Sequence, residues 1–123
     1  MRYLGAVRGT ARFASEDIVY RDVLFPVGTL VTTSLAGANR DHEVFEDPDT
    51  FDITRERDTA QMTFGAGIHF CMGAALARAE LQEALPLLAR RMPGLVRSGP
   101  IEWKPSTFGI WGPSRLPLRF DTT

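Results

Sequence analysis

The stretch FGAGIHFCMG, residues 64–73, constrains this chain more than any other part of its sequence. Glycine occupies positions 65 and 67, and the single cysteine of the chain, Cys71, comes shortly before a third glycine at 73. Glycine adopts positive φ without strain and lets a backbone approach a ligand closely. An alanine-rich run with helical character follows at once. The pattern predicts a tight loop that presents Cys71 at the start of a helix.

The predicted helix begins near Gly73 and ends at Pro93-Gly94, a combination that stops helices. Its apolar residues recur at spacings of four, three and four: Leu81, Leu85, Leu88 and Met92. Because this spacing places them on one face, we expect one buried stripe. Pro86 lacks the N–H group that a helix interior needs, so we also expect a bend there.

The segment before the loop indicates strands and turns. Apolar and polar residues alternate around Ile18–Tyr20, and β-branched and aliphatic residues resume from Thr29 to Leu35. Pro26-Val27-Gly28 lies between the two runs, so we predict a β-hairpin that turns there. Residues 39–58 carry many acidic side chains and no sustained period, which predicts a long irregular segment.

The tail predicts a second small hairpin. Apolar and polar residues alternate again in IEWKPSTFGIWGPSRLPLRFD, residues 101–121, on both sides of Gly109 to Pro113. Glycine and proline are the residues that most often interrupt strands with turns.

Length and charge exclude several classes of protein. At 123 residues the chain is long enough for one domain with a modest core. Its formal net charge is −1 and its basic residues are scattered, so a nucleic-acid partner is not expected. No apolar run approaches the roughly 20 residues of a membrane span, and no signal-peptide core precedes the first strand. One cysteine cannot form an internal disulfide, which favours a reducing compartment, the cytoplasm.

The position of Cys71 has a chemical consequence. A sulfur atom at the start of a helix lies near unpaired backbone N–H groups, which favours the thiolate. The ordinary alternative for a lone cysteine is a small buried apolar residue without chemistry. A phosphate loop is a further alternative, but the lysine of such loops is missing after Gly65-Ala66-Gly67, and we set it aside.

The loop resembles the cysteine-ligand loop of the cytochrome P450 family, whose soluble bacterial members have the pattern Phe-Gly-x-Gly-x-His-x-Cys-x-Gly. The matching residues are Phe64, Gly65, Gly67, His69, Cys71 and Gly73. RYLGAVRGTARFASED, FPVGTLVTTSLAGANRD, VFEDPDTFD and LPLRF look like successive segments of the same family, in the same order. The resemblance therefore identifies residues 1–123 as the C-terminal haem-thiolate region of a cytochrome P450.

The resemblance implies a role for each residue of the site. Cys71 would be the proximal thiolate ligand of the iron of haem b, and Phe64 would pack beside it. Gly65, Gly67 and Gly73 would shape the haem-binding loop. His69 and Arg12 match positions that pair with haem propionates. The alternatives are a loop histidine without a ligand and a solvated strand arginine.

The resemblance also points to residues that would contact a substrate. They are Val7, Arg8, Phe108 and Ile110, which align with segments that line the distal pocket in the family. The alternative for the three apolar residues is packing in the core, and for the arginine it is exposure to solvent.

The expected fold is an α+β fragment of the mainly helical cytochrome P450 fold. It should contain one long helix after the cysteine loop, a short helix near Ser34 to Asn39, two small β-hairpins and a long irregular segment over residues 36–63.

Three positions depart from the family pattern. His42 replaces a proline, Thr50 replaces an arginine, and the glutamate that should pair with Arg2 would precede Met1. Without the glutamate and the arginine at position 50, Arg2 has no reason to be buried.

The function implied by the resemblance is that of a haem-thiolate monooxygenase, which inserts one oxygen atom of O2 into a small organic substrate. Its electrons would come from a redox partner of the ferredoxin and reductase type. Because the central helix of the family is missing, we expect the fragment to be inactive alone, and its leucine stripe to lose cover and favour association. Two alternatives are a non-catalytic remnant that binds haem or a partner, and a redox-active thiol protein that uses Cys71.

Overall fold

The structure is a computed structural model, and it describes residues 1–55, 61–105 and 110–121. Its chain contacts divide it into two compact units. The first contains Met1–Thr63 together with residues 106–111, and the second contains Phe64–Pro105 together with Gly112–Thr123. The cysteine loop therefore opens the second unit.

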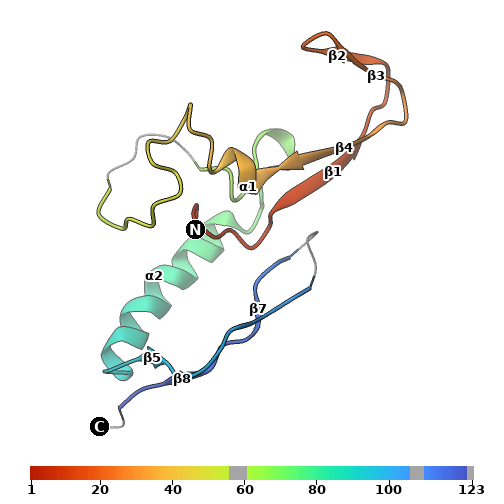
Figure 1. Cartoon of the computed structure of the whole chain (residues 1–123). Helices are drawn as coiled ribbons and strands as arrows, with labels where there is room; N and C mark the ends of the chain where they lie inside the picture. Colours follow the sequence, from red (N-terminus) through yellow and green to blue (C-terminus); the bar gives the residue numbers. More distant parts are fainter. Residues whose placement is uncertain (56–60, 106–109, 122–123) are drawn as a thin grey trace. The chain divides into compact units, whose positions relative to one another are not determined.

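Two antiparallel strand pairs form one ribbon in the first unit. Strand β1 (Gly9–Phe13) pairs with β4 (Leu30–Ser34), so that Gly9 lies opposite Ser34 and Phe13 opposite Leu30. Strands β2 (Ile18–Tyr20) and β3 (Val23–Phe25) pair with each other. Figure 1 shows the β2–β3 pair at the far end of the ribbon that β1 and β4 begin.

The predicted turn of the first hairpin is wrong. Ile18–Tyr20 pairs with Val23–Phe25 rather than with the run that starts at Thr29. The reversal occurs at Arg21 and Asp22, whose φ angles are 47° and 64°. A two-residue turn with positive φ at both positions matches the twist of the flanking strands, and aspartate tolerates this conformation better than most residues.

Pro26-Val27-Gly28 forms a second, separate turn. The Thr29 N–H group donates to the Pro26 carbonyl at 3.0 Å, and Gly28 has a φ of 82°. The Gly28 N–H group also donates to the Ala14 carbonyl at 2.8 Å. This hydrogen bond brings the chain from β3 back beside β1, where β4 begins. The sequence predicts this turn, but between the wrong pair of strands.

The short helix and the irregular segment are confirmed. Helix α1 (Leu35–Ala38) begins after Ser34, whose hydroxyl oxygen accepts a hydrogen bond from the Gly37 N–H group at 2.9 Å. Such a cap satisfies one of the unpaired donors at the helix start. From residue 39 to the loop, the described residues form turns and bends without a strand or an α-helix.

Arg2 lies at the centre of the first unit and corrects a further expectation. Its side chain is buried, and it donates to the carbonyl oxygens of Asn39 and Pro48, the latter at 3.0 Å. Its guanidinium also lies 4.9 Å from the centre of the Phe45 ring. Backbone carbonyls and an aromatic face therefore surround a buried cation that we expected to be excluded from the core.

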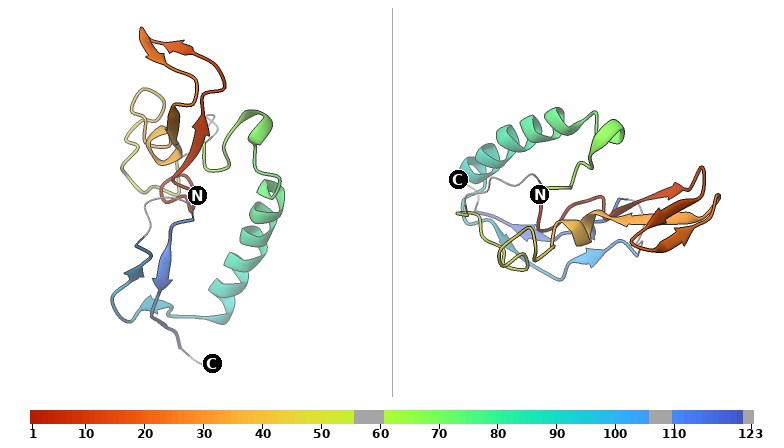
Figure 2. Two further views of the ribbon diagram at one scale, coloured as in Figure 1. Left: turned by 90° about the vertical axis from the view of Figure 1, so that its right-hand side faces the viewer. Right: turned by 90° about the horizontal axis from the view of Figure 1, so that it is seen from above.

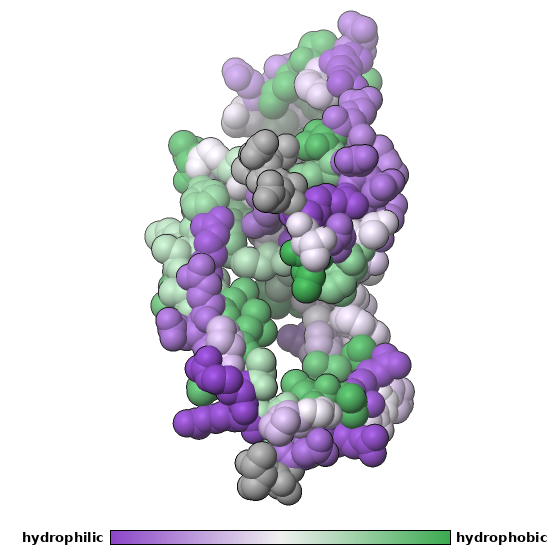
Figure 3. All heavy atoms as spheres, turned by 90° about the vertical axis from the view of Figure 1, so that its left-hand side faces the viewer, coloured by the Kyte–Doolittle hydropathy of each residue, from purple (hydrophilic) through white to green (hydrophobic). Residues whose placement is uncertain are grey.

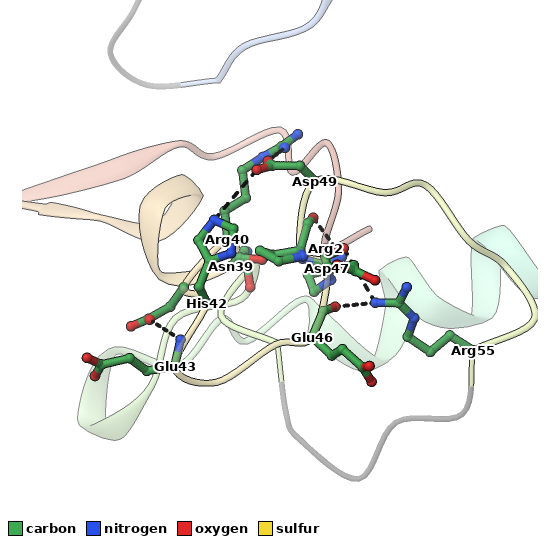
Figure 4. Close-up of polar contacts among 11 residues, drawn as sticks. Arg2, Asn39, Arg40, His42, Glu43, Glu46, Asp47, Asp49 and Arg55 are labelled. Atoms are coloured by element: carbon green, nitrogen blue, oxygen red, sulfur yellow. Dashed lines mark hydrogen bonds and ion pairs between the residues drawn. The ribbon is translucent and has the colours of Figure 1, made fainter.

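Asn39 joins this cluster to the residues that precede the cysteine loop. It is only 2% exposed. Its side-chain oxygen accepts from the Met62 N–H group at 2.6 Å, and its side-chain nitrogen donates to the Thr63 hydroxyl at 3.2 Å. Figure 4 shows Asn39 between Arg2 and Arg40. A single buried amide therefore connects α1, Arg2 and the end of the irregular segment.

An exposed polar group lies beside this cluster. Arg40 forms an ion pair with Asp49, donates to the Tyr3 carbonyl at 3.1 Å and lies over the Tyr3 ring at 4.5 Å. The hydrogen bond that Arg40 donates to the Asp49 carboxylate is the main cause of an Arg40 pKa above its usual value. His42 Nε2 lies 3.7 Å from the second carboxylate oxygen of Asp49 (Figure 4). The histidine that departs from the family pattern thus faces an acid.

The second unit contains the long helix and the second hairpin, as expected. Helix α2 spans Ala74–Arg91 (Figure 2). Pro86 lies inside this range, so the helix does not end there. Strand β6 (Glu102–Trp103) pairs with β7 (Pro113–Arg115). An outer pair, β5 (Val96–Arg97) with β8 (Leu118–Arg119), extends the hairpin. Part of the predicted turn, including Gly109, lies outside the described residues.

The leucine stripe of α2 is exposed, so the prediction of a buried stripe is wrong. Leu81 is 39% exposed, Leu85 59% and Leu88 40%, and Ala74 is the buried residue of this helix. The uncovered apolar surface that we also expected is therefore present. Apolar residues appear on the surface among hydrophilic ones in Figure 3. None of the helices in the described ranges is long and apolar enough to cross a membrane.

Asn39→Ala should destabilise the chain. The substitution leaves the partly buried Met62 N–H group without its acceptor, which costs roughly 1–3 kcal/mol. Urea unfolding followed by circular dichroism measures this loss. Thr63→Val is the comparison variant, because it removes the hydroxyl that accepts from the Asn39 side-chain nitrogen and leaves the bond from the Met62 N–H group in place. An Asn39→Ala variant as stable as the wild type would contradict the role assigned to this amide.

Candidate haem-thiolate site

The loop before α2 contains one short helical turn between two constrained glycines and the cysteine. The 3₁₀ turn η1 spans Gly67–His69, and the Phe70 N–H group donates to the Gly67 carbonyl at 3.0 Å. Gly65 and Gly67 have φ angles of 71° and 67°. These values lie in the left-handed region, where a side chain is strained. The glycine spacing seen in the sequence is therefore a requirement of the backbone.

Backbone hydrogen bonds hold Cys71 on both sides. Its N–H group donates to the Phe64 carbonyl at 3.0 Å, and its carbonyl accepts from the Ala74 N–H group at 3.2 Å. Gly73 is the N-cap residue of α2. The loop thus starts and ends at a hydrogen-bonded pair, and Cys71 lies just before the helix, as the sequence predicts. The thiol is free and exposed.

Two aromatic rings and one arginine lie at the base of the loop. The Phe64 and Phe70 rings meet edge to face, with centres 6.4 Å apart and planes at 64°. The Arg78 guanidinium lies 4.8 Å from the centre of the Phe64 ring. Arg78 stands on the second turn of α2 and is not among the site residues predicted from the sequence. Helical spacing from Gly73 was the signal that could have placed it near the loop.

His69 and the flanking apolar residues are exposed. His69 ends the η1 turn, and its neighbour Ile68 is 97% exposed. Met72, the residue after the cysteine, is fully exposed. The side of the loop that carries Cys71 is therefore open, with apolar side chains around it.

The loop has room for a flat ligand at its glycines. A Cβ atom added to Gly67 would meet nothing within 4 Å, and one added to Gly65 would meet only the His69 carbonyl, at 3.9 Å. A metal held by a single protein thiol must bring its remaining ligands with it, and the porphyrin ring of haem supplies four nitrogens. An exposed thiol beside open glycines fits this group.

Arg12 belongs to the first unit, whereas Phe64, His69 and Cys71 belong to the second. It lies on β1 opposite Val31 and is exposed. Its guanidinium donates to the adjacent Ala11 carbonyl at 2.8 Å. The structure therefore places Arg12 on an exposed strand position of the first unit.

The structure brings together three of the four residues proposed to contact a substrate. Val7 and Ile110 form an antiparallel bridge, and the adjacent Trp111 N–H group donates to the Ala6 carbonyl at 2.7 Å. The Arg8 guanidinium lies 4.8 Å from the centre of the Trp111 ring. Val7, Arg8 and Trp111 help to line a small cavity of about 40 Å³ in the first unit. The fourth residue, Phe108, lies outside the described residues.

Comparison with known proteins gives a consistent result. The sequence profile of the family described as "Cytochrome P450" matches residues 1–92. The chain is 47% identical to cytochrome P450 107B1 of Saccharopolyspora erythraea over 97% of its own length and 30% of that protein. It is 46% identical to luteothin monooxygenase of Streptomyces thioluteus, over 89% of this chain and 27% of that one.

The solved structures agree. P450BioI, solved in complex with an acyl carrier protein that carries hexadec-9Z-enoic acid, matches with a TM-score of 0.90 and 41% identity, over 98% of this chain and 31% of that one. CYP109E1 from Bacillus megaterium, solved in complex with testosterone, matches with a TM-score of 0.90 and 36% identity, over 98% of this chain and 34% of that one. Thus the chain spans about three tenths of the length of its curated relatives. Members of this family bind haem b through a cysteine thiolate, and this chain belongs to the cytochrome P450 family.

Proposed function

We propose that residues 1–123 are the C-terminal haem-thiolate region of a cytochrome P450 monooxygenase, with Cys71 as the proximal ligand of the iron. The observation that carries this proposal is the exposed thiol of Cys71, held by backbone hydrogen bonds between two positive-φ glycines and the start of α2. A fixed backbone presents one sulfur in one place, which suits an axial ligand. The match to the family in the same register supports it.

The other residues of the loop hold and shield the cofactor. Phe64, whose ring is half-buried against Phe70, keeps water from the sulfur. His69 and Arg12 donate to the haem propionates, for which exposed N–H groups are suited. When haem is bound, its iron supplies the oxygen chemistry, and the thiolate donates the electron density that favours cleavage of the O–O bond.

The substrate of the whole protein is a small organic molecule. We assign its contacts to Val7, Arg8, Phe108 and Ile110, and the bridge between Val7 and Ile110 supports a shared surface for the described members of this set. The names of two relatives, luteothin monooxygenase and nocardicin C N-oxygenase, describe oxidations of small organic compounds. The electrons of the whole protein come from a redox partner, which we assign to the ferredoxin and reductase type.

These 123 residues hold the haem but do not complete an oxygenation by themselves. The relatives that carry monooxygenase or oxygenase names are more than three times as long as the matched region.

Two other functions follow from particular observations. A haem-binding remnant without oxygen chemistry needs only the cysteine loop. A redox-active thiol protein needs only the exposed free thiol of Cys71.

Haem titration tests the assignment of Cys71. Purified chain titrated with ferric haem should take up a single haem per chain, with a Soret band that reports thiolate ligation. Cys71→Ser should lose that band, because a neutral hydroxyl is a poor ligand for iron. Met72→Ser is the matched control, since it makes the same change at the fully exposed neighbour and should leave the band in place.

If both variants keep the Soret band, the assignment of Cys71 is contradicted. Failure of the wild type to bind haem while Cys71 reacts rapidly with oxidants or alkylating reagents would favour the redox-thiol function instead.

Gly67→Ala should strain the loop. The φ of 67° at this residue costs a side chain roughly 1–2 kcal/mol. The variant should therefore unfold at lower urea concentration and bind haem more weakly. Gly112→Ala is the matched control, because Gly112 lies outside the cysteine loop, has no positive φ, and an added Cβ there would meet nothing within 4 Å. Equal losses in the two variants would contradict the backbone requirement at Gly67.

A further inference from the structure

Phe64 and Arg78 connect the first residue of the cysteine loop to the helix that follows it. The Phe64 carbonyl accepts the hydrogen bond of the Cys71 N–H group at 3.0 Å. The ring of the same residue lies against the Arg78 guanidinium at 4.8 Å. One residue thus holds the cysteine backbone through its main chain and the helix through its side chain. We name this arrangement of Phe64, Cys71 and Arg78 the loop clasp.

The surroundings of Arg78 indicate that its guanidinium interacts with the Phe64 ring rather than with a carboxylate. In the ranges that the structure describes, Arg78 takes part in no ion pair, although Glu80 and Glu83 stand on the same helix. Arg78 is exposed, whereas Phe64 is half-buried. A planar guanidinium over an aromatic face is attracted by the ring quadrupole and covers the ring at the same time.

The other ring contact described for Phe64 does not replace the clasp. Phe70 meets the ring by its edge, at 6.4 Å, and belongs to the same loop. It therefore moves with the loop when the loop opens. Arg78 is anchored on α2, an 18-residue helix, and is the contact that ties the ring to a rigid element.

We propose that Arg78 is a positioning residue of the cysteine loop. By holding the Phe64 ring on α2, it keeps the Phe64 carbonyl in place as the acceptor of the Cys71 N–H group. The consequence for haem ligation rests on the function proposed above, but the clasp itself belongs to the chain without haem. Loss of Arg78 lets the loop open, and the Cys71 N–H group then exchanges with solvent more often.

Amide hydrogen exchange in the haem-free chain tests the clasp directly. In Arg78→Met, which keeps most of the stem and removes the cation, the Cys71 amide should exchange roughly two- to five-fold faster than in the wild type, the factor expected for an exposed cation–π contact. Arg78→Lys retains a cation and should restore most of the protection. Arg90→Met, near the far end of α2, is the matched control and should leave the Cys71 amide unchanged.

A double-mutant cycle separates the clasp from a general effect on the helix. In Phe64→Leu the ring is absent, so adding Arg78→Met should produce little further change in exchange at Cys71. Additive effects of the two substitutions, or a Cys71 amide that exchanges equally in Arg78→Met and the wild type, would overturn the proposal. Exchange within α2, read at Leu85 and Leu88, shows whether the helix itself is intact.

Haem binding distinguishes failure of the clasp from failure of the proposed function. If the clasp and the function both hold, Arg78→Met should bind haem with a smaller fraction of the red-shifted Soret band in the reduced carbon monoxide complex, and Arg78→Lys should recover it. Faster exchange at Cys71 without haem binding by any variant would support the clasp and contradict the function. Normal exchange with an unchanged carbon monoxide spectrum would contradict the clasp alone.

Discussion

The hydrogen bond from the Cys71 N–H group to the Phe64 carbonyl closes the loop on which the proposed chemistry depends. It spans eight positions of sequence that the backbone can connect only by turning tightly, and positive φ at Gly65 and Gly67 makes that turn possible. The loop ends at the N-cap of α2, so its far end is fixed by a helix. One local constraint, the closed loop, therefore fixes the position of the cysteine, the spacing of the glycines and the start of the helix.

A different interaction organises the first unit. Arg2 is a buried cation whose surroundings consist of the carbonyls of Asn39 and Pro48 and the ring of Phe45. The Asn39 side chain then connects this group to Met62 and Thr63 through two hydrogen bonds. Carbonyl oxygens can satisfy a guanidinium without a carboxylate, because each carries lone pairs and costs less to desolvate than a charge. This accounts for the burial of the Arg2 side chain in the first unit.

Local patterns were predictable from the sequence, and contacts between distant residues were not. The glycine spacing, the helix after Gly73 and the position of Cys71 follow from short-range rules, and the structure confirms them. The first hairpin was misassigned because Pro26 and Gly28 are stronger turn signals than Arg21-Asp22, although the latter pair makes the reversal. The partners of Arg2 and the pairing of Arg78 with Phe64 depend on tertiary geometry, which periodicity does not encode.

The reduced carbon monoxide difference spectrum of the haem-supplied chain tests the central claim most directly, since this spectrum responds to the ligand opposite the gas. A strongly red-shifted Soret band in the wild type would show that the Cys71 sulfur binds iron as a thiolate, and our account predicts this result. A haem-loaded chain whose band lacks the shift, or a folded chain that takes up no haem, would contradict the account and leave the exposed thiol as the functional group.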